Sequence, residues 1–431
     1  MEPAHSVWYH AAEFAPSAQL AASLRREAGR LGTPFFAYDG ARLDEDARAL
    51  SAAFAGSGWI RLYSLKANAL PGIVARVASH GLGANAVSRG ELALAARAGV
   101  PPARSALEGI GKAPADLRTA VDLATEGRPL LWVSIESADE AAALAALARV
   151  HLPRRRRLDV LLRLNPGVEP DTHAGLAVGR SDSKFGLAAS ELPRAVEAGG
   201  GPGGPLRFRG IHVHVGSQLA SADAWGDGVR SGLRAFAELA RVGDDADTLD
   251  LGGGFPAGVP RAPGLDQFAA AAAGALREAR GRGRPARAAV EPGRALVARA
   301  GWLVGRVLHV RDRAGRQVVI DAGMTELVRP ALYGAEHPAF ALTSLGRPVP
   351  PGEPGTSVTL DGPICESTDR LGRATLPPVE RGDLIAVGLA GAYASVMASS
   401  YNGRPHPAEA LLEPDGRRIT LRRRGTLRSL T

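Results

Sequence analysis

The run Trp59-Ile60-Arg61-Leu62-Tyr63-Ser64-Leu65-Lys66-Ala67-Asn68 is a short apolar segment that ends in a lysine, and it begins a regular pattern. From there on, short runs rich in Val, Ile and Leu alternate with Ala-rich stretches of helical spacing, at roughly the length of a βα unit. The candidate strands are residues 60–65, 83–87, 106–108, 131–135, 159–164, 210–214, 248–251 and 288–291. Eight such units in sequence predict an α/β protein with a closed (β/α)8 TIM barrel, although an open doubly wound sheet would show a similar rhythm.

The segments around these strands complete the predicted architecture. Candidate helices are residues 88–98, 115–123, 138–148, 222–242 and 265–280. After about residue 300 the chain changes to short β-like runs broken by Pro and Gly, at residues 302–310, 317–320, 357–360 and 384–387. We therefore predict a barrel over residues 46–300 and a mostly β domain over residues 301–431. An early run at residues 34–38 precedes the barrel pattern, so residues 1–45 are expected to contribute to the β domain.

Composition excludes several classes of protein. Of the 431 residues, 45% are apolar and 22% charged, which is an ordinary globular balance. The formal charge of +8 comes from local clusters such as residues 154–157 and 422–424, without interleaved aromatic residues, so we expect no nucleic-acid partner. A single cysteine, Cys365, excludes an intrachain disulfide. Because residues 1–9 lack a basic and apolar leader and no apolar run reaches membrane length, we expect a cytoplasmic protein with no membrane partner.

Lys66 is the first candidate for chemistry. A lysine at the end of an apolar strand is partly buried, which disfavours its ammonium form. The free amine can then condense with an aldehyde to form a Schiff base. An ordinary lysine at a strand end is the alternative.

Two histidines, His212 and His214, stand two apart in a candidate strand, so their side chains share one face. This arrangement would permit a joint metal site, but no third ligand is evident nearby, and we predict no metal. A flat imidazole can instead stack on an aromatic ligand, and either histidine can be a satisfied structural residue. His214 lies nearer the carboxyl end of its strand, where barrel enzymes build their sites.

Further groups follow two later strands. Gly252, Gly253 and Gly254 end one strand, and their backbone N–H groups could close around a phosphate, although a flexible loop gives the same string. Glu291 follows another strand, with Arg294 three residues later. A carboxylate suits a protonated ring nitrogen and a guanidinium suits an anion, while a surface ion pair is the plain alternative.

The C-terminal part adds groups that suit a substrate. Arg329 and Tyr333 offer a planar cation and a phenol to a carboxylate, Cys365 and Glu366 are adjacent, and Tyr393 follows a glycine and an alanine. One ligand satisfies the whole set. An aldehyde for the lysine, an aromatic ring for the histidine, a pyridinium for the strand-end glutamate and a phosphate for the glycines together describe pyridoxal 5′-phosphate.

With these residues the chain resembles the fold-type III pyridoxal-phosphate-dependent decarboxylases. Among them it resembles the diaminopimelate decarboxylases more than the ornithine or arginine decarboxylases. The match runs from about residue 33 to the C-terminus. Its further motifs, in the family's order, are Arg163-Leu164-Asn165-Pro166, Ser183-Lys184-Phe185-Gly186, Asp321-Ala322-Gly323-Met324 and Ser400-Tyr401-Asn402.

The resemblance implies a barrel that binds pyridoxal phosphate, followed by a β domain, in a homodimer whose two active sites each use residues of both subunits. It assigns the cofactor's aldehyde to Lys66, stacking on the ring to His214 and the pyridinium nitrogen to Glu291. Other positions that match cofactor contacts are Ser217, Gly253, Gly254, Arg294 and Tyr393.

For the substrate, the resemblance implies contacts to Arg294, Arg329, Tyr333, Glu366 and Tyr393. Cys365 and Glu366 match the pair that the partner subunit supplies, and Cys365 or Lys66 is the expected proton donor. The implied reaction is decarboxylation of meso-2,6-diaminopimelate to L-lysine.

Asn85 departs from the family pattern, which carries an aspartate before the Val-Ser pair. An amide holds no charge, so the electrostatics beside the cofactor are expected to differ. The alternatives are a paralogous decarboxylase of another amino acid in secondary metabolism, a non-catalytic homologue, and a carrier or racemase built on the same barrel. The non-catalytic reading would be marked by loss of Lys66 or Cys365, and neither is lost.

Overall fold

The computed structural model describes residues 11–169, 172, 179–180, 182–242, 245–259, 261–313, 315–350 and 353–430. The chain divides into two compact units. The barrel unit consists of Ala47–Pro256 and Arg261–Gly293, and the sheet unit of Met1–Asp46, Ala257–Pro260 and Arg294–Thr431. Residues 1–9, on which the expectation about a leader rests, lie outside the described residues. None of the helices in the described ranges is long and apolar enough to cross a membrane.

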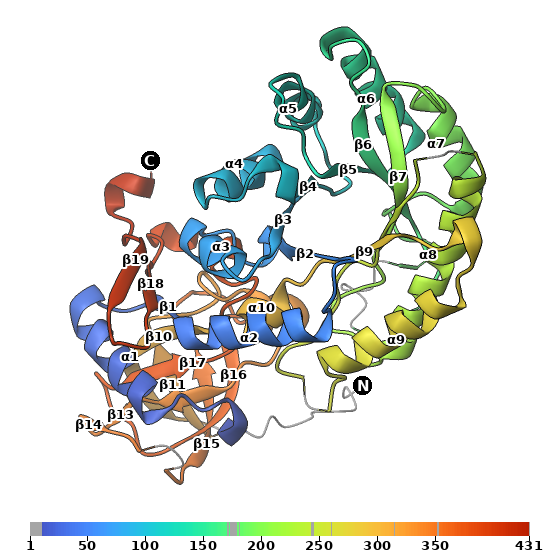
Figure 1. Ribbon diagram of the computed structural model, residues 1–431. Coiled ribbons are helices and arrows are strands. Elements are labelled where there is room, and N and C mark those ends of the chain that lie inside the picture. The colour runs from blue at the N-terminus through green and yellow to red at the C-terminus, as the bar shows by residue number, and fades with distance from the viewer. Residues whose placement is uncertain are drawn as a thin grey trace. The chain divides into compact units, whose positions relative to one another are not determined.

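The barrel unit is a closed barrel of eight parallel strands, which confirms the predicted fold class (Figure 1). Its strands are β2 (Trp59–Ser64), β3 (Gly83–Ala86), β4 (Ser105–Leu107), β5 (Trp132–Ile135), β6 (Leu158–Leu164), β7 (Leu206–Val213), β8 (Thr248–Asp250) and β9 (Arg287–Val290). Strand β2 pairs with both β3 and β9, so the sheet closes on itself and leaves no open edge. Each predicted strand is present, and β7 begins four residues earlier than predicted, at Leu206 instead of residue 210.

Helices follow most of the strands: α3 (Pro71–Ala78), α4 (Arg89–Arg97), α5 (Pro114–Thr125), α6 (Ala138–His151), α7 (Leu192–Ala198), α8 (Ala222–Val242) and α9 (Leu265–Glu278). The sequence did not predict α3 and α7, which are short and have a proline in their first turn. Proline is tolerated there because the first turn of a helix has no partner for its N–H groups.

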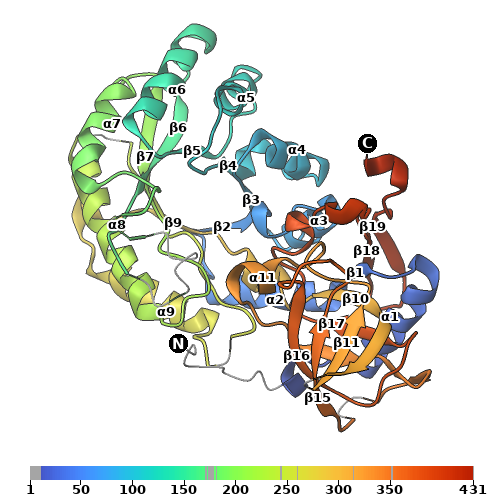
Figure 2. The same cartoon turned by 180° about the vertical axis from the view of Figure 1, so that it is seen from behind.

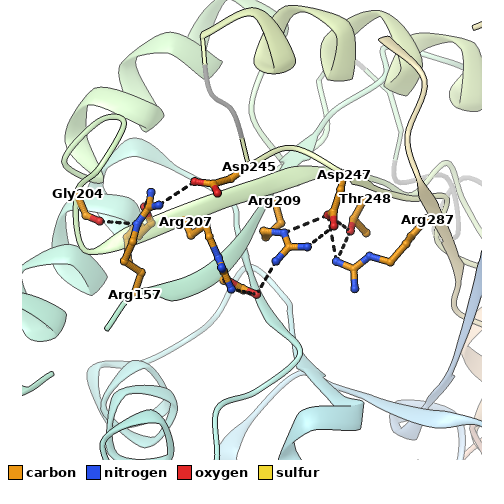
Figure 3. A network of polar contacts seen from close by, with 10 residues as sticks. Arg157, Gly204, Arg207, Arg209, Asp245, Asp247, Thr248 and Arg287 are labelled. Atoms are coloured by element: carbon orange, nitrogen blue, oxygen red, sulfur yellow. Dashed lines mark hydrogen bonds and ion pairs between the residues drawn. The ribbon is translucent and has the colours of Figure 1, made fainter. Parts of the chain in front are cut away.

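Charged side chains gather where strands β6 to β9 begin (Figure 3). Asp159 accepts hydrogen bonds from Arg207 and Arg209, and Asp247 accepts from Arg209 and Arg287. Active sites of barrels lie at the opposite, carboxyl ends of the strands. This network therefore joins neighbouring strands and is a structural feature of the barrel.

The sheet unit is mostly β, as predicted, and its main sheet has the strand order β16-β15-β11-β10-β1-β18-β19 (Figure 2). The strands of the unit are β1 (Phe35–Asp39), β10 (Gly301–Asp312), β11 (Arg316–Ile320), β12 (Ala339–Ala341), β13 (Thr343–Ser344), β14 (Arg347–Pro348), β15 (Thr356–Asp361), β16 (Arg370–Leu376), β17 (Leu384–Val387), β18 (Ala408–Leu412) and β19 (Arg418–Arg422). Strand β1 pairs antiparallel with β10 and parallel with β18. It is buried almost throughout, which explains its unbroken apolar run of residues.

The helices of the sheet unit are α1 (Ala18–Leu31), α10 (Arg294–Val297) and α11 (Arg329–Tyr333), and α2 (Gly40–Ala53) begins in this unit and ends in the barrel unit. Ser17 caps α1 by accepting a hydrogen bond from the N–H of Leu20 at 3.1 Å. Leu24 of α1 packs with Phe35, Trp302 and Val304 in the core of the unit. Apolar faces of a helix and a sheet thus bury one another.

Candidate active site

Lys66 is carried by a tight turn at the carboxyl end of β2. The strand ends at Ser64, one residue earlier than predicted, and Leu65–Ala67 forms one turn of 3-10 helix. The hydroxyl of Tyr63 donates a hydrogen bond to the carbonyl oxygen of Asn68 at 2.8 Å across this turn. Leu65 and Ala67 are fully buried, whereas Lys66 is partly exposed. The lysine is therefore held on a rigid turn at the end of the barrel where active sites are built.

His214 follows directly after β7, and its Nδ1 accepts a hydrogen bond from the N–H of Gly253 at 3.1 Å. Desolvation, helped by the positive charges of Lys66 and Arg163, holds the pKa of His214 well below its usual value. A neutral imidazole that accepts at Nδ1 carries its proton on Nε2. The structure thus presents His214 as a neutral, oriented ring, as stacking on a flat ligand requires.

The glycine loop is partly used by the protein itself. The N–H of Gly252 donates to Asp250 Oδ1 at 2.9 Å, and the N–H of Gly253 is taken by His214. Trp225, which is fully buried, donates from Nε1 to the carbonyl oxygen of Gly253 at 3.1 Å. Two of the three glycine amides thus orient neighbouring side chains. The assignment of Gly253 and Gly254 to the phosphate of the cofactor stays a prediction.

Gly254 joins this loop to a second one. Its φ is +106°, and a Cβ at this position would lie 2.6 Å from the carbonyl oxygen of Gly216. The N–H of Leu219 also donates to the carbonyl oxygen of Gly254 at 3.2 Å. The loop that contains Ser217 thus packs against the glycine loop, and only glycine at 254 permits this approach.

A cluster of buried polar groups occupies the carboxyl-end interior of the barrel. Glu291 follows β9 directly, Asp250 ends β8, Glu108 follows β4 and His212 lies in β7. His212 lies between two of the carboxyl groups. Its Nε2 is 3.7 Å from Glu291 Oε1, and its Nδ1 is 3.8 Å from Glu108 Oε2. All four residues are less than 5% exposed.

The pKa values in this cluster diverge. Burial, helped by the charge of Glu108, raises the pKa values of Asp250 and Glu291 well above their usual range. Burial lowers the pKa of His212 to about 4, so this imidazole is neutral at pH 7. For Glu108, burial opposes ionisation, but the charge of His212 and hydrogen bonds from Glu291 and Trp132 outweigh it and lower the pKa to about 2. Because His212 is neutral near pH 7, the hydrogen bonds and the positive charge of Arg163 are what favour the ionised form of Glu108 there.

Three atoms of the cluster are unsatisfied. Within the described ranges Glu291 Oε1, His212 Nε2 and Asp250 Oδ2 are buried without a hydrogen-bond partner. A buried carboxyl oxygen without a donor is costly unless a ligand supplies one. A protonated ring nitrogen is such a donor, so Glu291 fits the pyridine nitrogen of pyridoxal phosphate. The atoms of Glu108, His212 and Glu291 that could bind a metal also lie within 4.8 Å of one another. Both oxygens of Glu108 are already hydrogen-bonded, however, by Asn85 and Trp132.

The sheet unit holds the remaining predicted residues, beginning with Arg294 and Tyr393. Arg294 starts α10 and is buried, and the centre of its guanidinium lies 4.7 Å from the centre of the Tyr393 ring. Gly391 packs so closely that a Cβ there would lie 1.7 Å from the carbonyl oxygen of Val297. The close approach of the segment around Gly391 to helix α10 holds the Tyr393 ring against the Arg294 guanidinium.

Arg329, the first residue of α11, is oriented by a histidine that the sequence did not select. Arg329 Nη1 lies 3.2 Å from His337 Nε2, and His337 Nδ1 lies 3.0 Å from the carbonyl oxygen of Gly388. A carbonyl can only accept, so Nδ1 carries the proton and Nε2 accepts from Arg329. Burial and the nearby charge of Arg329 lower the pKa of His337 to about 3. Tyr333 ends the same helix and is partly exposed.

Cys365 and Glu366 lie on the surface of the sheet unit. Tyr401 donates from its hydroxyl to Glu366 Oε1 at 2.6 Å, and Asn402 Nδ2 lies 3.3 Å from Cys365 Sγ. All four side chains are exposed. The structure thus brings the Ser400-Tyr401-Asn402 motif against the Cys-Glu pair, a pairing that the sequence could not specify.

Three kinds of residue were missed by sequence reasoning. Glu108 and Asp250 end candidate strands, as Glu291 does, and the same rule applied to every strand end would have selected them. Trp132 and Ser134 lie in β5 and contact Glu108 and His212. His337 has no local pattern that marks it.

Comparison with known proteins gives a consistent result. Residues 41–298 match the family described as "Pyridoxal-dependent decarboxylase, pyridoxal binding domain". The diaminopimelate decarboxylase of Zymomonas mobilis is 34% identical over 395 residues, which cover 89% of each chain. The diaminopimelate decarboxylase of Pseudomonas aeruginosa is 35% identical over 410 residues, covering 95% of this chain and 94% of the other.

A solved structure agrees with these sequences. Diaminopimelate decarboxylase from Helicobacter pylori, complexed with L-lysine, superimposes with a TM-score of 0.84 at 29% identity. The match covers 94% of this chain and 98% of the other. The similarity therefore extends over both units of the chain.

Proposed function

This chain belongs to the pyridoxal-dependent decarboxylases, and on that premise we propose that it removes carbon dioxide from meso-2,6-diaminopimelate and forms L-lysine. The observation that carries the proposal is identity of 34–35% to two diaminopimelate decarboxylases over about nine-tenths of each chain. The complex of the H. pylori enzyme with L-lysine supports the same product. The alternative is decarboxylation of another amino acid by a paralogue.

The barrel unit supplies the cofactor groups in this proposal. Pyridoxal phosphate, when bound, accepts the electrons of the broken bond between Cα and the carboxylate. Lys66 Nζ would hold the cofactor covalently, and Glu291 Oε1 would accept a hydrogen bond from the N–H of its pyridine ring. The neutral ring of His214 would stack on the cofactor. Ser217 and Gly254 lie on the two adjacent loops that suit the phosphate.

Side chains of the sheet unit act on the substrate. We assign Arg294 and Tyr393 to the phosphate or a substrate carboxylate, and Arg329 and Tyr333 to a substrate carboxylate. His337 fixes one edge of the Arg329 guanidinium, since its Nε2 accepts from Nη1. A guanidinium so oriented can bind a carboxylate with two parallel hydrogen bonds.

Glu366 is the group that selects the substrate. A carboxylate accepts hydrogen bonds from an ammonium group, and meso-diaminopimelate carries a second ammonium far from the reacting carbon. Tyr401 holds Glu366 through its 2.6 Å hydrogen bond. Cys365 Sγ, or Lys66 Nζ, gives a proton to the carbon that has lost its carboxylate.

We further propose a cytoplasmic homodimer in which Cys365 and Glu366 serve the active site of the other subunit. Their exposure on the sheet unit supports this, because side chains that serve a neighbouring subunit have to lie at the surface. The proposed division of the chain is residues 1–45, 46–300 and 301–431, of which the first and last form the β domain. Sedimentation of the purified protein tests the dimer. A monomer that retains full activity would refute it.

The role of Lys66 has a sharp test because the chain contains three lysines, Lys66, Lys112 and Lys184. Borohydride reduction of the loaded protein fixes the cofactor on the lysine that holds it, and peptide mass spectrometry then identifies that residue. We expect the label on Lys66. Lys112 is ion-paired with Glu140 at 2.9 Å and serves as an internal control. Label on Lys112 or Lys184, or retained turnover in Lys66→Ala, would refute the assignment.

Substrate choice is tested by incubating the loaded protein with meso-diaminopimelate, ornithine, lysine and arginine, and identifying the products by mass spectrometry. We expect lysine from meso-diaminopimelate and little product from the others. Another amino acid turned over in its place would establish the paralogue.

A further inference from the structure

Glu108 is buried beside the cofactor groups and has no part in the chemistry proposed so far. It follows β4 directly and is 3% exposed. Trp132 Nε1 donates to its Oε1 at 3.2 Å, and Asn85 Nδ2 donates to its Oε2 at 3.1 Å. An indole N–H and an amide NH2 can only donate. Both oxygens therefore accept, which favours a carboxylate without a proton.

Glu108 is linked to Glu291 in two ways. One carboxyl oxygen of each side chain and a ring nitrogen of His212 lie within 4.8 Å of one another, and the ring of His212 lies between the two, 3.8 Å from Glu108 Oε2 and 3.7 Å from Glu291 Oε1. Ser134 fixes the ring, since its Oγ lies 2.9 Å from His212 Nδ1. The negative charge of Glu108 thus acts on Glu291 across a short, dry path.

The hydrogen bond from Asn85 to Glu108 explains the effect of an amide at position 85. A carboxylate at position 85 would stand about 3.1 Å from Glu108 Oε2, the distance of the present hydrogen bond. Two carboxylates this close cannot both ionise, and one of them takes up a proton. An amide at 85 avoids the conflict and donates to Glu108. The pair thus carries one negative charge, located on Glu108.

We propose that Glu108 is a positioning residue of the cofactor site, which supplies the negative charge behind a buried, protonated Glu291 and thereby keeps a proton on the ring nitrogen that Glu291 faces. The inference rests on the cofactor part of the proposed function and is independent of which amino acid is the substrate. The charged and titratable groups that act on this cluster are Lys66, Glu136, Arg163, His212, Asp250 and Glu291. Removal of one negative charge makes a nearby cation less favourable, so the ring nitrogen should lose its proton at lower pH.

The test uses the holoenzyme loaded with pyridoxal phosphate that carries nitrogen-15 in its ring, because the nitrogen chemical shift reports protonation directly. In the wild-type protein we expect the ring nitrogen to stay protonated from about pH 6 to pH 9. In Glu108→Gln, which keeps the shape and removes the charge, the midpoint should fall by about one to two pH units. Glu126→Gln, an exposed residue at the end of α5, is the matched control and should behave as wild type.

A second test exchanges the carboxylate and the amide between positions 108 and 85. Asn85→Asp alone places two carboxylates together and should weaken cofactor binding by about tenfold. The double variant Asn85→Asp with Glu108→Gln restores one carboxylate and one amide, and should recover most of the wild-type affinity and midpoint. A purely structural role for Glu108 would not move the nitrogen signal.

The proposal is overturned if Glu108→Gln titrates like Glu126→Gln, or if the double variant is no better than Glu108→Gln. Should Glu108→Gln fail to fold, Glu108→Met removes the same charge with a side chain of similar length and must shift the midpoint in the same direction. An unchanged midpoint in that variant also overturns the proposal. Failure of the wild-type protein to bind pyridoxal phosphate would instead refute the proposed function.

Discussion

His337 should make the sheet unit sensitive to mild acid. Its pKa falls from the usual 6.5 to about 3 because it is buried beside Arg329. The unfolded chain therefore binds this proton below pH 6.5, whereas the folded chain does not. The stabilisation is complete above pH 6.5 and is lost as the pH falls toward 3. At pH 5 the loss is 1.5 pH units times about 1.36 kcal/mol, or about 2 kcal/mol.

His337→Gln removes this dependence. Glutamine keeps an amide donor and acceptor but does not titrate. Calorimetry at pH 7.5 and pH 5 should show that the unfolding temperature of the wild-type protein falls by about 4–8 °C more than that of His337→Gln. His309→Gln, a substitution at an exposed position in the same unit, is the control. Its unfolding temperature should fall between pH 7.5 and pH 5 by as much as that of the wild-type protein. Equal losses in wild type and His337→Gln would refute the neutral, buried state of His337.

Two further substitutions test the geometry of the site. Gly252→Ala should weaken cofactor binding at least about tenfold, because at φ +65° the new Cβ would lie 2.6 Å from His214 Nδ1. Titration with the cofactor measures the affinity. Gly99→Ala is the control for backbone strain alone, because Gly99 also has a positive φ but no atom lies within 4 Å of a Cβ built there. Tyr401→Phe removes the hydroxyl that holds Glu366 and should raise KM for the substrate roughly fivefold with kcat little changed. A fall in kcat at constant KM would contradict that role.

The barrel could be predicted because its strands are short apolar runs and its helices have helical spacing, and both are local signals. The exact ends of the strands could not be predicted, as the segment around Lys66 shows. The apolar run continues to Leu65, but the chain turns after Ser64 because a hydrogen bond from Tyr63 to Asn68 closes a 3-10 turn. Short helices such as α3 were missed because eight residues give little periodicity.

Within the candidate site, Lys66, His214 and Glu291 could be selected because each follows or ends a strand of the barrel. Their electrostatic state could not be predicted. Glu291 and Glu108 are the same residue type at equivalent strand ends, yet the pKa of one is raised and that of the other lowered. The difference depends on neighbours in space, since the charge of His212 and the indole N–H of Trp132 both lower the pKa of Glu108, whereas the charges of Glu108 and Asp250 raise that of Glu291.

The sequence by itself determined the order of strands, the residue types at their ends and the family to which those types belong, because these are properties of short segments. Only the tertiary structure decided which of the strand-end groups meet. Asn85 and Glu108 are 23 positions apart, and Glu108 and Glu291 are far more distant in the chain, yet the closed barrel buries them in one interior. In that interior water is excluded, so charge and hydrogen bonding depend on neighbours in space, and sequence separation has no bearing on them.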